Sequence, residues 1–417
     1  MNIAIVTPRL EIGGAETYII SKTKYLAQRG HKILVISEGG CSEDKLDDNV
    51  LHVKISGIAS SPYSFNCYDR NKIINKLACS LVENHIQIIE AHNFSPILFV
   101  AISYRLHQIP YLHNNLLEFS YDRSFQTRWV TRKLSKINAF CVLNKSQLDY
   151  IENKCGCKLN SEILPIPVLL PNLPSDELNK ACENDYFLSV ARLSDDKAYI
   201  DYMLKGFLEY RMQIASNDGV RFVHVVGDGQ RYGVIKQISD AINSKLGYKA
   251  VILKGTLTGE ELAKEYYHCY AFVGVGTCLY IAAAFSKPTI IASGYKQHED
   301  KAWGFWGNNA DIDANSASGC ALYHNYETEY KDILAQIANN PMIAEEMGQK
   351  AYNLYASIYD MSAIIDRWEA YYQYVQNKQN DCYYNDIATK MFIYNKIIHM
   401  FYEIKRVFNK ICLLIKN

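Results

Sequence analysis

The sequence carries no net charge, because its 44 Lys and Arg residues balance its 44 Asp and Glu residues. A protein that binds a nucleic-acid backbone usually has a basic excess, so a dedicated nucleic-acid binder is excluded. The lack of an acidic excess argues equally against a disordered, solvating chain. The hydrophobic content of 49% is that of an ordinary globular protein, and 417 residues suffice for two or three domains.

Paired cysteines and long apolar runs are also missing. The twelve cysteines are scattered without any Cys-x-x-Cys, so neither a disulfide framework nor a zinc site is expected. No window of about 18 residues is continuously apolar, which excludes a membrane-spanning helix. The chain begins with a strand-like segment at residues 2–7 and not with a signal peptide. We therefore expect a cytoplasmic protein with reduced thiols.

Strand-like and helical segments alternate in both halves of the chain. Residues 2–7, 15–28 and 33–37 read as strand, helix and strand, a βαβ unit that predicts a parallel sheet. The same alternation restarts at residues 186–191. The sequence thus predicts an α/β fold with two Rossmann-like domains that face a cleft, where the ligands of such sheets bind. Further strands are expected at residues 86–91, 111–112, 139–143, 222–226, 251–253, 271–273 and 289–292, and further helices at 259–268, 326–339 and 341–374.

Proline marks the boundary between the two halves. Four of the ten prolines fall between residues 165 and 174, and proline resists both helix and central strand. The chain is therefore divided into an N-terminal domain at residues 1–164, a linker at 165–182, a C-terminal domain at 183–360, a helix at 361–377 that packs back toward the N-terminal domain, and a tail at 378–417.

The tail carries an apolar stripe with basic flanks. Ile387, Met391, Tyr394 and Ile398 are spaced by three or four residues, which places them on one helical face. Residues 387–417 hold six basic residues and one acidic residue, so the zero net charge hides a basic tail on a mildly acidic body. Such a helix suits the surface of an anionic membrane. Packing on the protein's own surface or on a partner helix is the alternative.

Six segments of the chain follow one another in the order and spacing of a known family. They are GGAETYIISKTKYLAQRGHKILVIS (13–37), YFLSVARLSDDK (186–197), VHVVGDGQ (223–230), LKGTLTGEELAKEYYHCYAFVGVG (253–276), AAAFSKPTIIAS (282–293) and NNPMIAEEMGQKAYNLY (339–355). This series resembles the glycosyltransferases of family 4 over roughly residues 1–376. The resemblance implies the GT-B fold, with an N-terminal domain for the acceptor and a C-terminal domain for a nucleotide sugar.

Two pairs of glycines follow expected strands, in the first and third of these segments. Gly13 and Gly14 lack a Cβ atom, so the backbone can approach a ligand, and the free N–H groups of the following helix favour an anion. A plain strand-to-helix turn is the alternative. Gly227 and Gly229 resemble a strand-end turn and not a dinucleotide fingerprint, because Tyr232 replaces the third glycine. We predict that all four glycines contact the nucleotide or the sugar.

Two cations follow the first strand of the second half. The resemblance implies that Arg192 and Lys197 bind the diphosphate of the donor. A diphosphate leaving group needs positive charge, and two fixed cations supply it without a metal. No metal and no cofactor are therefore expected, and the donor would be a UDP- or GDP-sugar. The alternative is a pair of solvated surface charges beside Asp195 and Asp196.

The two glutamates that the family carries eight positions apart are absent. Counting back from Pro288 places Ile281 at the second position, where the family's glutamate contacts the nucleotide ribose. Either ribose binding comes from elsewhere, or the donor is unusual, or the chain is catalytically weak or inactive. The candidate substitutes are Thr277, Tyr280, Glu299 and Asp300.

Two histidine segments that are similar to one branch of the family follow strands of the first half. They are Glu90-Ala-His92-Asn93 and Pro110-Tyr-Leu-His113-Asn114. A histidine there can bond a sugar hydroxyl or take a proton near neutral pH, although a lone histidine is more often structural. We predict His113 as the candidate catalytic residue and place Glu16, His92, Asn93 and Asn114 on the acceptor side.

These patterns favour a glycosyltransferase that moves a sugar from a nucleotide sugar to a glycan or lipid-linked acceptor. The resemblance alone implies retention of the anomeric configuration and a role in bacterial surface polysaccharide synthesis, such as O-antigen or capsule. The missing glutamates motivate a first alternative, a catalytically inactive binding or regulatory subunit. A second alternative, a sugar-nucleotide epimerase of the same fold, is disfavoured by Arg192 and Lys197. The tail would dock the protein on the inner face of the cell membrane.

Overall fold

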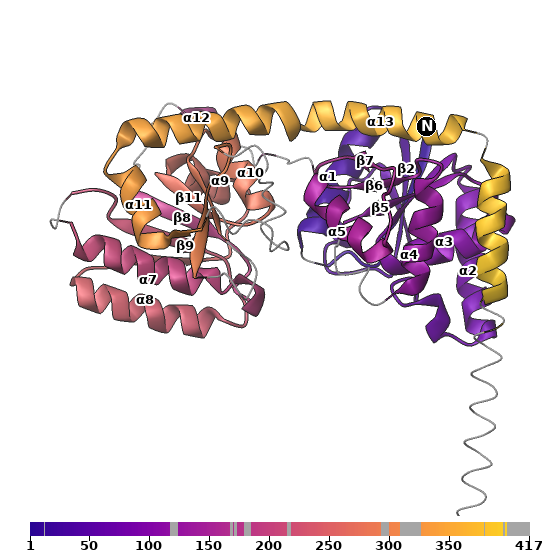
Figure 1. Cartoon of the computed structure of the whole chain (residues 1–417), viewed down its shortest axis with the longest axis horizontal. Coiled ribbons are helices and arrows are strands. Elements are labelled where there is room, and N and C mark those ends of the chain that lie inside the picture. The colour runs from indigo at the N-terminus through magenta and orange to yellow at the C-terminus, as the bar shows by residue number, and fades with distance from the viewer. Residues whose placement is uncertain are drawn as a thin grey trace, which may run out of the picture. The chain divides into compact units, whose positions relative to one another are not determined.

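A computed structural model divides the chain into two units. The first unit contains residues 1–164 and 365–417, and the second contains residues 165–364. Both units are drawn in Figure 1. The residues that the structure describes are 1–11, 13–116, 124–166, 170, 173–178, 185–214, 218–292, 300–308, 327–378, 380–394 and 397.

A parallel seven-stranded sheet with the order β3-β2-β1-β4-β5-β6-β7 forms the centre of the first unit. Chain order reverses between β1 and β4, so this sheet has its topological switch point there. Helix α1 leads from β1 to β2 and α3 leads from β4 to β5 in the opposite direction, so right-handed crossovers place them on opposite faces. The strands are β1 (Asn2–Val6), β2 (Lys32–Ser37), β3 (Val50–Lys54), β4 (Ile88–His92), β5 (Tyr111–Asn115), β6 (Phe140–Val142) and β7 (Glu162–Ile163), and the helices are α1 (Gly14–Gln28), α2 (Cys67–Glu83), α3 (Phe94–His107), α4 (Phe125–Ser135) and α5 (Lys145–Cys155).

The second unit repeats this plan with the strand order β10-β9-β8-β11-β12-β13-β14. Its first five strands are parallel, whereas β13 and β14 extend the edge in antiparallel pairing. The switch point lies between β8 and β11. The strands are β8 (Tyr186–Val190), β9 (Phe222–Val226), β10 (Val251–Gly255), β11 (Ala271–Gly274), β12 (Thr289–Ala292), β13 (Lys301–Phe305) and β14 (Thr328–Glu329), and the helices are α6 (Ser175–Leu178), α7 (Tyr199–Met212), α8 (Tyr232–Leu246), α9 (Gly259–His268), α10 (Thr277–Ala284), α11 (Tyr330–Ala338) and α12 (Pro341–Ile358).

The predicted fold class, two parallel α/β domains with a helical C-terminal region, is confirmed. Two details differ from the sequence-based expectation. The helix expected at residues 341–374 is two helices, α12 and α13 (Met361–Asn377), because Asp360 accepts hydrogen bonds from the backbone N–H groups of Ser362 and Ala363 and starts a new helix. The strands β3, β7, β13 and β14 were not expected; β7 and β14 are only two residues long, which is too short for a hydrophobic pattern.

Residues 381–394 form a further helix of the first unit, called the C-terminal helix below. Tyr384, Ile387 and Met391 are buried on it, and the Tyr384 hydroxyl donates to the Tyr111 carbonyl at 3.0 Å. The described start of the apolar stripe therefore packs on the protein's own surface, while Ile398 and the rest lie outside the described residues. Within the described ranges, no helix is long and apolar enough to cross a membrane.

Candidate functional site

In the second unit, the loops that leave β8 and β9 are joined by backbone hydrogen bonds. The Leu193 N–H donates to the Asp228 carbonyl at 3.0 Å, and the Arg231 N–H donates back to the Leu193 carbonyl at 2.9 Å. Gly227 and Gly229 have φ angles of 137° and 152°, in the range that favours glycine. A Cβ atom on Gly227 would lie 1.9 Å from the Ala191 carbonyl oxygen, so only glycine permits this close approach.

The predicted diphosphate ligands stand on the first of these loops. Arg192 and Lys197 both pair with Asp196, at 3.6 Å and 3.4 Å, and Lys197 ends the 3-10 turn at residues Asp195–Lys197. The Arg192 side chain is 65% exposed and therefore open to a ligand. Burial alone would raise the pKa of Asp196, but the Ser194 hydroxyl and the two cations hold it below its usual range. An incoming diphosphate would compete with this carboxylate for the same two cations.

The start of α10 lies close to this loop. Burial raises the pKa of the Cys278 thiol, and the charge of nearby Lys197 opposes this rise. Thr277 is the first residue of α10 and is partly exposed, so it stays a candidate ligand at the carboxyl end of β11. The structure thus gathers Arg192, Lys197, the glycine turn and Thr277 at the carboxyl ends of β8, β9 and β11, and the switch point lies between β8 and β11.

The other candidate substitutes for the missing glutamates are placed less favourably. Tyr280 is fully buried and stacks on Tyr359 at 4.0 Å, so in this structure its ring belongs to the core. Ile281 is half-buried against the same apolar cluster. Glu299 lies outside the described residues, and Asp300 is exposed.

In the first unit, the predicted glycine pair starts α1 beside the switch point. Gly13 is extended, with a φ of −176°, and Gly14 is the exposed first residue of the helix. The Glu16 carboxylate turns back toward the helix start, because its Oε2 lies 2.4 Å from where a Gly13 Cβ would be. A negative group at this position is stabilised by the free N–H groups of the first turn.

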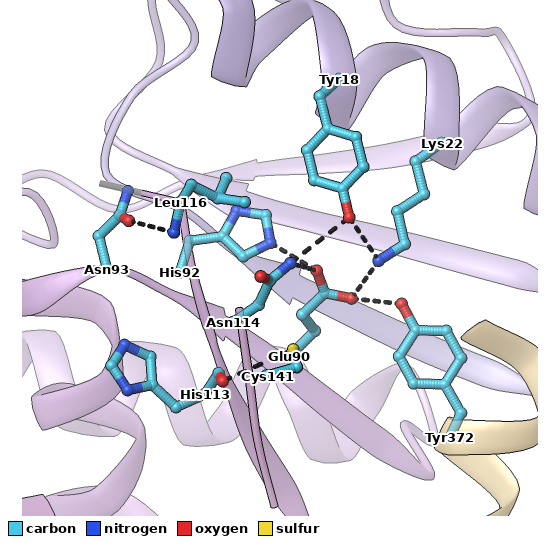
Figure 2. A network of polar contacts seen from close by, with 10 residues as sticks. All are labelled: Tyr18, Lys22, Glu90, His92, Asn93, His113, Asn114, Leu116, Cys141 and Tyr372. Carbon is cyan, nitrogen blue, oxygen red and sulfur yellow. Dashed lines mark hydrogen bonds and ion pairs between the residues drawn. The ribbon is translucent and has the colours of Figure 1, made fainter. Parts of the chain in front are cut away.

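A buried charged cluster of the first unit surrounds Glu90, in the middle of β4 (Figure 2). Oε2 of Glu90 accepts from Lys22 Nζ at 2.7 Å and from the Tyr372 hydroxyl, while Oε1 accepts from His92 Nε2 and Asn114 Nδ2, each at 2.7 Å. Three of the four donors come from other elements, namely α1, α13 and the neighbouring strand β5, whereas His92 lies on β4 itself. The side chains that meet here are Tyr18, Lys22, Glu90, His92, Asn114, Trp368 and Tyr372.

Charge balance explains why this cluster is tolerated inside the fold. Burial would raise the pKa of Glu90, but the Lys22 charge and the His92 hydrogen bond hold it well below its usual range. Burial lowers the pKa of Lys22 to about 8 against the raising effect of Glu90. The ammonium of Lys22 also lies 3.0 Å from the centre of the Trp368 ring, which stabilises a desolvated cation.

His92 and Asn114 therefore lie together, as register partners on β4 and β5. Asn93, the next predicted residue, has a φ of 54°, and its Oδ1 accepts from the Leu116 N–H at 2.9 Å, which ties the end of β4 to the end of β5. Both histidine segments thus reach the carboxyl edge of the sheet. His92 and Asn114 contact Glu90 and Tyr18, so their described role is to complete the buried cluster.

His113 points to the other face of β5, because neighbouring residues of a strand alternate. Its Nδ1 lies 3.1 Å from the Thr131 hydroxyl of α4, and the side chain is fully buried. Burial lowers the pKa of His113 to about 3, so the imidazole is neutral at neutral pH. As it lies here, His113 would reach a substrate only after a rearrangement, and its catalytic role stays a prediction.

The sequence reasoning did not identify the Glu90 cluster as a unit. One signal was present: Lys22 follows Tyr18 by four residues, on the buried face of α1, and Glu90 interrupts the apolar residues Ile88, Ile89 and Ala91 of β4. The two partners from α13, Trp368 and Tyr372, could not be inferred from any local pattern. In the part of the chain that the structure describes, no group of three His, Cys, Asp or Glu side chains is arranged to hold a metal.

Comparison with known proteins agrees with this topology. Residues 12–168 match the family model of Glycosyltransferase Family 4. Curated proteins give no matching sequence. Among solved structures, the chain is similar to a glycosyltransferase from Rickettsia africae, at 14% identity and a TM-score of 0.65, covering 90% of this chain and 99% of that chain.

Two further structures show the same two-domain fold at low identity. HepE of Anabaena, solved in complex with UDP, is 14% identical with a TM-score of 0.65, covering 89% of this chain and 99% of its own. WaaG, a glycosyltransferase involved in lipopolysaccharide biosynthesis, is 12% identical with a TM-score of 0.57, covering 89% and 99%. The shared topology of both units shows the GT-B fold, and the first unit is similar to Glycosyltransferase Family 4.

Proposed function

We propose that the chain transfers a sugar from a nucleotide-sugar donor, with retention, to a glycan or lipid-linked acceptor in bacterial surface polysaccharide synthesis. The observation that carries this proposal is the meeting of the Arg192–Lys197 loop with the Gly227–Gly229 turn at the switch point of the second unit. The complexes of HepE with UDP and with UDP-glucose support a nucleotide-sugar donor. WaaG supports a surface-glycan product such as lipopolysaccharide.

In this proposal the chain's own cations replace a metal. Negative charge develops on the diphosphate as the bond to the sugar breaks, and Arg192 and Lys197 stabilise it there. Asp196 holds both cations in place before the donor arrives. The free N–H groups at the start of α10 add to the same positive field. The acceptor binds at the first unit, on the side of Glu16 and Asn93.

The protein also associates with the inner face of the cell membrane in this proposal, through residues 387–417. Their basic composition suits anionic lipids, and surface docking brings the enzyme to a lipid-linked acceptor.

A donor-by-acceptor activity screen of the purified protein tests the proposed reaction. Lys197→Ala and Arg192→Ala should each lower kcat/KM at least about tenfold, because each removes a charge that stabilises the leaving group. Lys236→Ala is the matched control, since this lysine of α8 is exposed and pairs only with Asp240 among the described residues. Unchanged kinetics in both variants would remove the diphosphate role.

One observation favours a second candidate, a nucleotide-binding subunit without activity. The position of the family's ribose-binding glutamate is Ile281, which is half-buried in the core. Calorimetric binding of UDP or GDP without product formation across all acceptors would support this candidate. Product formation with any donor excludes it.

A further inference from the structure

An open apolar pocket of about 220 Å³ lies in the first unit, between α4 and the C-terminal helix. This volume is smaller than the roughly 300–1,000 Å³ typical of small-molecule sites. The pocket therefore suits a narrow apolar group, such as part of a hydrocarbon chain, and not a nucleotide sugar. Gln126 donates to the Tyr394 hydroxyl at 2.8 Å and thereby ties the two helices together. The pocket is lined by Phe125, Gln126, Trp129, Lys390, Met391 and Tyr394.

Large apolar side chains are exposed on both sides of this pocket. Phe125 of α4 is 54% exposed, and Ile393 of the C-terminal helix is 51% exposed. Phe392 and Ile397 are exposed as well. The packing of this helix on the first unit buries Ile387 and Met391, whereas Ile393 and Ile397 stay exposed. Such a gathering of apolar groups marks an interaction surface.

The charges around the pocket are mostly basic. Asp386 is the acidic group on the C-terminal helix that faces α4, and it pairs with Lys390 at 2.7 Å and with Lys133 at 3.9 Å. Asp381 accepts a hydrogen bond from Tyr104 at 2.8 Å and so faces α3. The basic side chains of α4 and the C-terminal helix are Arg128, Arg132, Lys133 and Lys390. Two acidic groups therefore oppose four basic ones.

The sequence beyond the C-terminal helix continues the same chemistry. Residues 398–417 contain Lys405, Arg406, Lys410 and Lys416 but only one acidic residue, Glu403. A surface with exposed aromatic and aliphatic groups, basic flanks and a basic continuation complements an anionic bilayer. An acidic protein partner would pair with the basic side chains but would not need an open apolar pocket as narrow as one acyl chain.

We infer that α4 and the C-terminal helix form one docking face for an anionic lipid bilayer, whose pocket takes an acyl chain of a lipid. This docking face consists of Phe125 and Trp129 of α4 with Ile393 and Ile397, which follow the pocket residue Lys390 by three and seven positions on the helix. The aromatic rings lie at the headgroup level, and the basic side chains meet the phosphates. The inference rests on the proposed membrane association, and it adds α4 and a lipid-chain site that the tail alone does not provide.

The chain offers a built-in reporter for this face. It has four tryptophans, and Trp303, Trp306 and Trp368 are all fully buried. Trp129 is partly exposed and lines the pocket. A change in tryptophan emission on membrane binding therefore reports a change in the surroundings of Trp129 on α4.

The experiment mixes the full-length protein with vesicles of phosphatidylcholine and phosphatidylglycerol whose acyl chains are brominated. The emission should shift to the blue and be quenched by bromine, and Trp129→Phe should abolish both changes while vesicles still co-sediment with the protein. Phosphatidylcholine vesicles should produce neither change. Phe125→Ala and Ile393→Ala should each weaken vesicle binding about tenfold, since each loses one buried apolar side chain. Met342→Ala, at an 81% exposed position of α12, is the control that should change nothing.

Each contrary outcome has one meaning. Co-sedimentation without quenching of Trp129 overturns the docking face but leaves the membrane association through residues 398–417 intact. A blue shift that depends on protein concentration without vesicles assigns the face to a second copy of the chain and also overturns the inference. Absence of all vesicle binding removes both membrane proposals, while glycosyl transfer to a water-soluble acceptor remains a separate test of the reaction.

Discussion

At the scale of single residues, the first unit depends on a carboxylate that has no access to water. Glu90 is fully buried on a strand that is covered on both faces, and every oxygen lone pair that it offers is met by a donor from Lys22, His92, Asn114 or Tyr372. A buried charge of this kind is costly to create and more costly to leave unpaired. The buried cluster therefore holds α1, β4, β5 and α13 together through its hydrogen bonds and ion pair.

We expect the effects of Lys22 and Glu90 on the free energy of unfolding to be strongly coupled, because the two form a buried ion pair. Glu90→Gln should lower the free energy of unfolding by about 3–5 kcal/mol, because it leaves the Lys22 ammonium buried without its counter-charge. Lys22→Met should also destabilise, since Glu90 then keeps only neutral or histidine donors. Chemical denaturation of both variants and of the double variant measures the coupling. If the double variant lost the sum of the two single effects, the pair would not be acting as a unit.

At the scale of elements, two loops of the second unit work as one. The glycine turn after β9 and the cation-bearing loop after β8 share backbone hydrogen bonds, and Gly227 allows the two backbones to touch. The sequence predicted both loops from their motifs. It could not show that one supports the other, because a glycine's role depends on what occupies the space where its Cβ would be.

Gly227→Ala tests this support. Its Cβ would clash with the Ala191 carbonyl at a φ of 137°, so we expect a loss of about 1–3 kcal/mol in stability and weaker nucleotide diphosphate binding. Thermal unfolding and calorimetric titration with UDP or GDP provide the two measurements. Gly233→Ala in α8 is the matched control, because its Cβ meets nothing within 4 Å, and it should be neutral or slightly stabilising. Equal behaviour of both variants would contradict a supporting role for Gly227.

At the scale of the whole molecule, the first unit is built from both ends of the chain. Residues 365–417 belong to the same unit as residues 1–164, so α13 and the C-terminal helix pack on strands that come from the first part of the sequence. Tyr372 reaches Glu90 and Tyr384 reaches the Tyr111 carbonyl. The first unit therefore has its full set of buried contacts only when the C-terminal residues are present.

Two truncations separate this packing role from membrane docking. Deleting residues 387–417 removes the buried Ile387, Ala388 and Met391, and we expect about 3–5 kcal/mol of lost stability from the apolar area that returns to water. Deleting residues 398–417 keeps these side chains, so thermal unfolding should remain unchanged while vesicle binding weakens. Equal melting temperatures for both truncations would show that the C-terminal helix adds nothing to the first unit.

The sequence by itself determined the central parallel strands of both sheets, the restart of the pattern after the prolines, and the position of each motif at the end of a strand. These features depend on neighbours in the chain: periodicity, turn residues and caps act over a few positions. Only the tertiary structure decided that Lys22, Glu90 and Tyr372 meet, that Tyr280 and His113 are buried, and that the tail's stripe begins by packing on the first unit. Those outcomes depend on strand order and helix seating, which bring residues hundreds of positions apart into contact and which no local pattern encodes.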